Sequence, residues 1–293
     1  MTAFLHQLRW DSAFWRDLAR RGASHGPAWF RRWSPGPIGL AFALWPTARR
    51  ATLRHRLRTI LGIRSPAREA FDLARSYASF AHSLADSLAV SSGPLDGIVR
   101  VEAQGVDLLT SALARGRGVI IGTAHTSGWE VSLAALRHHG DAPIAVVMRR
   151  ERDDHARRLH GALSSSRDLI VIEVGEDPLA SLPLIAHLRR GGIVALQMDR
   201  CPPGTRHYVG VGQNVRFALP AGPFVLAAAS GAPILMALSR RTSYRNYAIT
   251  LSTPIELPRR PGEDRVRQAA DRVVATLVQF IRTHPNQWFA FEE

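Results

Sequence analysis

The chain of 293 residues carries a formal net charge of +14 at pH 7, and 46% of its residues are hydrophobic. This hydrophobic content excludes a disordered chain, and the length suits one large domain or a compact domain with a helical extension. The single cysteine, Cys201, excludes an internal disulfide framework and any zinc site built on cysteines.

The first quarter of the chain is basic and rich in tryptophan. All 38 basic residues are arginines, and residues 1–70 hold 13 of them against three acidic side chains, so +10 of the net charge lies there. Five of the seven tryptophans lie in the same region. Arginine and tryptophan together suit the headgroup layer of an anionic membrane, although a solvated basic face has the same composition.

No nucleic-acid recognition motif accompanies this charge, so we expect no nucleic-acid partner. The longest apolar stretch of the region, Ile38–Trp45, lies between two prolines and is far shorter than the roughly 18–20 residues that span a bilayer. The N-terminal residues mix arginine and aspartate with aromatic side chains and lack the apolar core of a signal peptide. We therefore expect a protein that stays in the cytoplasm and lies on an anionic membrane surface.

Helical periodicity dominates residues 1–90, most clearly over Ala67–Leu88. The run Ser91–Pro94 breaks this pattern. We therefore predict an N-terminal basic, tryptophan-rich helical region over residues 1–92 and an α/β region over residues 93–293, joined as one continuous structural unit.

Beyond the break, strand and helix signals alternate. The strand segments are nearly continuous apolar runs, which indicates strands covered on both faces. The alternation predicts an α/β fold with a mixed central sheet flanked by helices. The expected strands are Gly118–Ala124, Pro143–Met148, Leu169–Val174, Gly192–Met198, Pro233–Leu238 and Tyr247–Ser252. The expected helices are Glu130–His138, Arg152–Ser164, Leu179–Arg190, Ala221–Ala229 and Glu263–Arg282.

The hexapeptide His125–Glu130 lies where the first of these strands ends and a helix begins. Ligands of open α/β sheets bind at this end of the strands. A neutral imidazole at His125 can take a proton from an attacking hydroxyl, while the carboxylate of Glu130 fixes its tautomer. The alternative is a capping box of Ser127 and Glu130 that only closes the start of the helix, with His125 as an ordinary loop residue.

Together with this hexapeptide, further segments on both sides of it occur in a recognisable order. In chain order they are Ala48–Gly62, Val101–Leu109, Ala114–Ile121, His125–Glu130, Ala145–Arg150, Gly191–Arg200, Tyr208–Gly212, Leu219–Ala228, Ala232–Ile234 and His284–Trp288. Together they cover roughly Trp45–Phe291. In this order the chain resembles the bacterial lipid A biosynthesis acyltransferases and the relatives that acylate phosphatidylinositol mannosides, within the lysophospholipid acyltransferase superfamily.

The resemblance implies transfer of a fatty acyl group from an acyl thioester, on acyl carrier protein or coenzyme A, to a hydroxyl of a lipid or glycolipid. His125 is then the general base and Glu130 orients it. A thioester is already activated, so we expect neither a cofactor nor a metal. The backbone amides at the start of the helix near Ser127 are candidate donors to the oxyanion.

Four residues complete the predicted site as substrate-binding residues. They are Arg149, Asp199, Arg200 and Gly128. Arg149 suits a phosphate or phosphopantetheine group because a guanidinium grips such groups bidentately. Asp199 suits the orientation of an arginine or of the substrate, and Gly128 suits a close approach of substrate to the backbone. Arg149 and Asp199 are equally well explained as a solvated arginine and a turn carboxylate.

The resemblance also places the protein at the cytoplasmic face of the bacterial inner membrane, as a peripheral enzyme. Thr126-Ser127-Gly128 departs from the Phe-Gly-Asn that is common in lipid A acyltransferases. Arg200-Cys201 follows the aspartate where those enzymes commonly have a glutamine and a second aspartate. These differences leave the identity of the acceptor open. Two other functions therefore remain. One is an acyltransferase with a non-lipid hydroxyl or amine as acceptor, and the other is a non-catalytic basic module that binds membranes.

Overall fold

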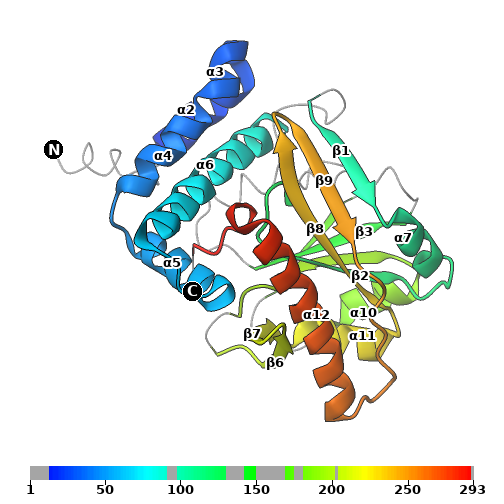
Figure 1. Cartoon of the computed structure of the whole chain (residues 1–293). Coiled ribbons are helices and arrows are strands. Elements are labelled where there is room, and N and C mark those ends of the chain that lie inside the picture. Colours follow the sequence, from blue (N-terminus) through cyan, green and yellow to red (C-terminus); the bar gives the residue numbers. More distant parts are fainter. Residues whose placement is uncertain are drawn as a thin grey trace.

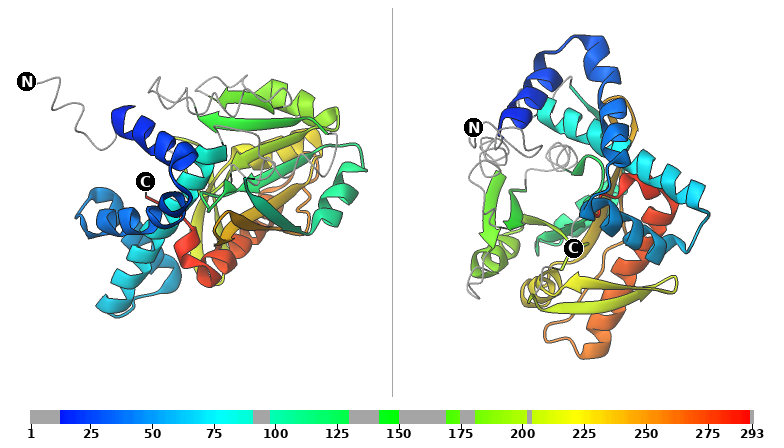
Figure 2. Two further views of the ribbon diagram at one scale, coloured as in Figure 1. Left: turned by 90° about the horizontal axis from the view of Figure 1, so that it is seen from above. Right: turned by 90° about the vertical axis from the view of Figure 1, so that its left-hand side faces the viewer.

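The computed structural model describes residues 13–90, 98–129, 142–149, 169–174, 181–201 and 204–291 (Figure 1). In this part of the chain, a group of N-terminal helices lies against a layered α/β body (Figure 2). The predicted helices Glu130–His138 and Arg152–Ser164 lie outside the described residues, as does the predicted break at Ser91–Pro94.

Residues 13–90 fold into five consecutive helices, which confirms the helical reading of this region. They are α2 Ala13–His25, α3 Ala28–Trp33, α4 Pro35–Leu44, α5 Ala48–Leu61 and α6 Pro66–Val90. The hydroxyl of Thr47 caps α5 by accepting a hydrogen bond from Arg50 N at 3.2 Å, and Gly62 ends that helix with a φ of +79°. The 25-residue α6 packs against α2 and α4. Within the described residues, none of the helices is long and apolar enough to cross a membrane.

The centre of the body is a seven-stranded mixed sheet in the order β1-β9-β8-β2-β5-β3-β4. Its strands are β1 Arg100–Gln104, β2 Val119–Thr123, β3 Ile144–Arg149, β4 Leu169–Val174, β5 Ile193–Gln197, β8 Ile234–Ser243 and β9 Asn246–Leu251. Neighbouring strands are parallel except for β8 and β9, which form an antiparallel hairpin. The predicted fold class, an α/β protein with a mixed sheet, is therefore confirmed.

Three strands were not expected from the sequence. Besides β1, a separate antiparallel ribbon consists of β6 His207–Gly212 and β7 Val215–Pro220. The turn between them uses Gln213 and Asn214, both with positive φ, which is the backbone of a tight hairpin turn. Burial alternates along β6, but two of its inward positions are Gly210 and Gly212 while Val209 and Val211 are exposed, which explains why its sequence gives a weak strand signal.

Helices cover both faces of the sheet. Besides α5 and α6 they are α7 Val106–Leu113, α10 Leu182–Arg189, α11 Gly222–Ser230 and α12 Glu263–Thr283, which is followed by the short turn η3 Pro285–Gln287. Every residue of β2 is buried, as the apolar run predicts. Ile120 belongs to the core cluster shared with α5, α10, α11 and α12, whereas Val119 and Ile121 belong to the cluster shared with α7.

The N-terminal helices share a core with the sheet. Leu53, Leu57 and Ile60 of α5 are buried in the same cluster as Met198 and Trp288. Arg282 of α12 donates a hydrogen bond from Nε to the carbonyl of Ile60 at 3.2 Å. The α5 helix is therefore packed beside the strand ends at which the candidate site lies. The division of the chain at residue 92 stays a prediction, because the junction is outside the described residues.

Candidate active site

The register of two neighbouring strands brings His125 and Asp199 together. Strands β2 and β5 are parallel, and their last residues, Thr123 and Gln197, are paired. His125 and Asp199 each follow two residues after these paired positions. Because parallel strands end at the same edge of a sheet, two side chains that are 74 residues apart in sequence emerge side by side.

Asp199 holds the imidazole of His125 by two hydrogen bonds. Its Oδ1 lies 2.8 Å from Nδ1 of the imidazole, and its Oδ2 accepts from the backbone N–H of the same residue at 3.1 Å. The carboxylate is completely buried, whereas 24% of the His125 side chain is exposed. Because an ionised carboxylate only accepts hydrogen bonds, Nδ1 carries the ring proton and Nε2 keeps a free lone pair. This is the arrangement of a general base with its orienting acid.

The environment of Asp199 keeps it ionised. Burial by itself raises the pKa of this carboxyl, but the attraction of His125 and the hydrogen bonds from His125 and Trp288 outweigh burial and lower the pKa to about 2. The indole Nε1 of Trp288 donates to Oδ2 at 2.8 Å. The acid is therefore charged at any pH at which His125 is able to act as a base.

The loop after His125 is fixed by one local hydrogen bond and by two segments that are distant in sequence. Thr126 N donates to the carbonyl of Ala124 at 2.7 Å, and Ser127 N donates to the carbonyl of Gln287 at 3.0 Å. Gly128 N donates to the hydroxyl of Ser83 on α6 at 3.0 Å. These three amides already have acceptors, and the amides from Glu130 onward lie outside the described residues, so the oxyanion donors expected at the start of the helix stay a prediction.

Gly128 occupies a crowded position with a backbone conformation that favours glycine. Its φ is +72°, and a Cβ at this position would lie 2.3 Å from the ring of Tyr247. Tyr247 is itself anchored, because its hydroxyl donates to Asp86 Oδ2 at 2.8 Å and Arg241 donates to the same oxygen at 2.9 Å. Burial, and then Asp86, raise the pKa of Tyr247. The close neighbour of Gly128 in the structure is thus a tyrosine ring, and its predicted contact with substrate stays a prediction.

The other predicted residues are only partly placed. Arg149 is the last residue of β3, at the same edge of the sheet as the His125–Asp199 pair, but its side chain lies outside the part that the structure describes. Glu130 also lies outside the described residues, so its role stays a prediction. Arg200 donates from its guanidinium to the carbonyl of Phe289 at 3.0 Å, which gives it a structural contact beside any role with substrate.

Sequence reasoning named one member of this constellation with another partner and left a second without a role. It placed Asp199 at a strand end but assigned it to an arginine or the substrate, because the carboxylate five residues after the histidine offered a nearer partner. The available signal was that both side chains follow buried strands by the same number of residues. Trp288 had no predicted role. Among the described residues, no group of three or more His, Cys, Asp or Glu side chains is placed to hold a metal ion.

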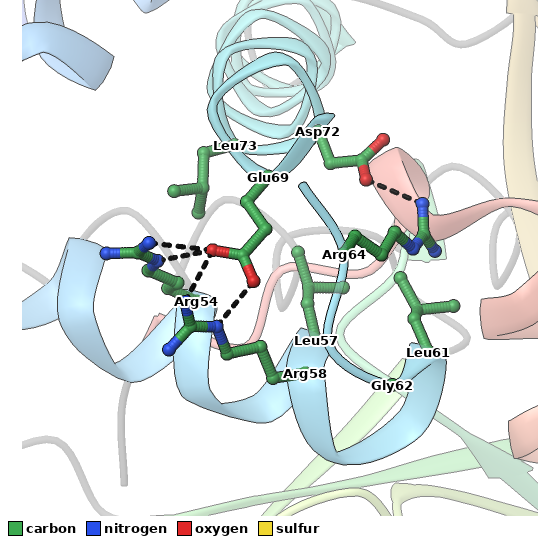
Figure 3. A pocket seen from close by; sticks show the side chains of 9 residues that line it. All are labelled: Arg54, Leu57, Arg58, Leu61, Gly62, Arg64, Glu69, Asp72 and Leu73. Atoms are coloured by element: carbon green, nitrogen blue, oxygen red, sulfur yellow. Dashed lines mark hydrogen bonds and ion pairs between the residues drawn. The ribbon is translucent and has the colours of Figure 1, made fainter. Parts of the chain in front are cut away.

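A second charged cluster lies between α5 and α6 (Figure 3). Glu69 accepts hydrogen bonds from Arg54 at 2.8 Å and from Arg58 at 2.5 Å, while Arg64 donates to Asp72 at 2.7 Å. The hydrogen bond from Arg58 contributes most to lowering the pKa of Glu69 to about 2, against the effect of burial. Both carboxylates are paired with arginines, so the cluster is a joint between two helices rather than a catalytic site.

Two comparisons bear on what this arrangement does. A family model described as bacterial lipid A biosynthesis acyltransferase matches residues 26–293. No curated protein matches the chain. The matched range includes α3–α6, the whole sheet, and both members of the His125–Asp199 pair.

Proposed function

Since the chain belongs to the bacterial lipid A biosynthesis acyltransferase family, and is thereby an acyltransferase, we propose that it moves a fatty acyl group from an acyl thioester to a hydroxyl of a lipid or glycolipid. The donor carries its acyl chain on acyl carrier protein or coenzyme A. The observation that carries this proposal is the buried carboxylate of Asp199 on Nδ1 of His125, whose side chain is about one quarter exposed.

In the proposed reaction, Nε2 of His125 takes the proton of the acceptor hydroxyl while the oxygen attacks the thioester carbonyl. The tetrahedral intermediate expels the thiolate, and the imidazolium returns the proton to the sulfur. Asp199 stays ionised throughout and stabilises the imidazolium, as the acid of a Ser-His-Asp triad does. Glu130 is close in sequence, and because Nδ1 is bound to Asp199, any contribution of Glu130 acts elsewhere than on that nitrogen.

The N-terminal helices support a place on a membrane surface. Four large apolar side chains in and directly after α3 and α4 are more than half exposed, namely Trp29, Trp33, Leu44 and Trp45. Arg31 and Arg32 lie in the last turn of α3, and the guanidinium of Arg32 lies 5.2 Å from the centre of the Trp33 ring. Exposed aromatic side chains beside arginines suit the headgroup layer of an anionic membrane. We therefore propose a peripheral enzyme on the cytoplasmic face of the inner membrane, with these helices turned toward the lipid.

The test is transfer of labelled myristoyl or palmitoyl groups from coenzyme A and from acyl carrier protein into bacterial membrane lipids. We expect the wild type to label a lipid and His125→Ala to label none. His55→Ala is the matched control, because it removes an exposed histidine of α5 and should leave transfer unchanged. Transfer by His125→Ala at the wild-type rate contradicts the proposed base. Transfer to no lipid by the wild type, with all variants bound to membranes, favours the non-catalytic module.

A further inference from the structure

The segment Gln287–Phe289 runs along the loop His125–Ser127 and is bonded to it through the backbone. Ser127 N donates to Gln287 O at 3.0 Å, and Phe289 N donates to His125 O at 2.8 Å. Between these two bonds, Thr126 and Trp288 form an isolated antiparallel bridge. The backbone of this segment therefore helps to fix the position of His125. The side chain of Trp288, which lies between the two bonds, is directed toward Asp199.

That side chain is an indole in a constrained position. Trp288 is 1% exposed, and its ring packs beside Phe217 with ring centres 6.1 Å apart. Its Nε1 donates to Asp199 Oδ2 at 2.8 Å, and the backbone N–H of His125 donates to the same oxygen. Two donors on Oδ2 leave Oδ1 for the imidazole. The terminal torsion of an aspartate has a broad, two-fold preference, so the donors rather than the side chain itself decide which way the carboxylate faces.

We propose that Trp288 is a positioning residue for the acyl transfer, because its N–H holds the Asp199 carboxylate in the orientation that presents Oδ1 to Nδ1 of His125. This inference rests on the proposed function and adds a third member to the pair. The indole N–H is the only hydrogen of Trp288 able to donate in this way, and phenylalanine keeps most of the apolar ring without it.

Loss of the indole N–H has two consequences for catalysis. The carboxylate keeps a single donor on Oδ2, so it samples orientations in which the imidazole is not aligned. Its negative charge is also less dispersed, and it attracts the imidazolium more strongly. Another titratable group near Asp199 is Cys201, whose thiol pKa is raised chiefly by burial and also by Asp199, while Arg56 of α5 lowers it. None of these groups is changed by Trp288→Phe.

The first measurement is the pH dependence of kcat/KM for Trp288→Phe, with myristoyl-coenzyme A and myristoyl acyl carrier protein as donors and vesicles of bacterial total lipid as acceptor. We expect roughly a 10- to 100-fold fall in kcat, the size of one hydrogen bond to a charged group, with KM for the donor little changed. The acid limb of the profile should move to higher pH, by about half a unit to one unit, because the protonated imidazole is favoured.

Phe217→Leu is the matched control. It loosens the packing of the same indole and leaves the N–H in place, so a merely structural role of Trp288 predicts that both variants lose stability and neither moves the pH profile. The effect of Trp288→Phe should also largely disappear when Asp199 is already asparagine, since residues that act through one another are not additive. An unshifted acid limb, or the same fold loss in both backgrounds, overturns the proposal.

An NMR titration of ¹⁵N-labelled histidine keeps the positioning role and the proposed function apart. The His125 signal is assigned by its absence in His125→Ala, and its midpoint should rise in Trp288→Phe but not in Phe217→Leu. If the wild type transfers no acyl group but the midpoint still rises in Trp288→Phe, the proposed function is rejected and the positioning contact is supported. A wild type that transfers normally with no shift in the midpoint rejects only the positioning role.

Discussion

Replacing Asp199 with asparagine gives a direct test of how the imidazole is oriented. In the wild type, Oδ2 accepts from His125 N and from Trp288 Nε1, and Oδ1 accepts from His125 Nδ1. An amide has one oxygen, and the two donors hold that oxygen in the place of Oδ2. The amide NH₂ must then face Nδ1. Nδ1 becomes an acceptor, so the ring proton moves to Nε2.

The variant therefore presents an N–H to the acceptor hydroxyl where the wild type presents a lone pair. In serine proteases the corresponding change leaves the geometry intact and lowers kcat about 10⁴-fold, because the imidazole is in the wrong tautomer. That factor corresponds to about 5 kcal/mol of transition-state stabilisation. We expect a loss of this size in kcat for Asp199→Asn, with KM for the thioester nearly unchanged, since the exchanged atoms face His125 and not the donor.

The assay is the initial rate of acyl transfer at neutral pH for the wild type, Asp199→Asn and Glu130→Gln, with near-UV circular dichroism to show that each variant is folded. A folded Asp199→Asn that keeps more than roughly a tenth of the wild-type kcat would refute the orienting role, because the wrong tautomer costs far more than that. Glu130→Gln is the informative companion. A large fall in kcat there, with an unchanged pH profile of the remaining activity, assigns Glu130 a role away from Nδ1.

Three more predictions concern stability and membrane binding. Gly128→Ala should lower the free energy of unfolding by about 2–4 kcal/mol, because it adds a Cβ at positive φ against a tyrosine ring, whereas Gly116→Ala, at a φ of +70° with open space around it, should cost less. Urea unfolding measures both, and equal losses would show that the ring contact is unimportant. Because the folded pKa of Asp199 is lowered to about 2, it contributes about 2 kcal/mol above its ordinary pKa, and that stability is lost as the pH falls from about 4 to 2. The unfolding free energy of Asp199→Asn should therefore fall less over that interval, and parallel curves would contradict the lowered pKa. Trp33→Ser should weaken sedimentation with anionic vesicles, whereas Val211→Ser, which removes an exposed apolar side chain from β6, should not; equal binding of both variants argues against α3 as the membrane face.

The strands that build the site were predictable because they are buried on both faces. Continuous apolar runs such as Val119–Thr123 and Ile193–Gln197 have few alternative structures, and the observed bounds differ from the predicted ones by one residue at each end. By contrast, Arg100–Gln104 is a half-exposed strand at the edge of the sheet, and its polar residues give no comparable signal. Burial on both faces is thus what made part of the sheet readable from sequence.

The partner of His125 was harder to predict, because it depends on strand order. The sequence does not show that β5 lies beside β2, because β3 and β4 lie between them along the chain. A carboxylate at Glu130 was visible within one motif, whereas Asp199 becomes a neighbour only through the pairing of Thr123 with Gln197. For the same reason, the sequence could not show that the loop amides already have hydrogen-bond acceptors. These acceptors, the hydroxyl of Ser83 and the carbonyl of Gln287, lie far along the chain.

The way in which the catalytic loop is held also has a consequence for folding. The loop is fixed by Ser83, Asp199 and Ser239, at sequence separations of 45, 74 and 112 residues. Contacts between segments so distant in sequence form slowly, because each needs a long stretch of chain to be closed first. During refolding from urea, we therefore expect the far-UV signal of helices such as α6 and α12 to recover well before acyl transfer does. The base and its acid meet only when the topology of the whole sheet is complete.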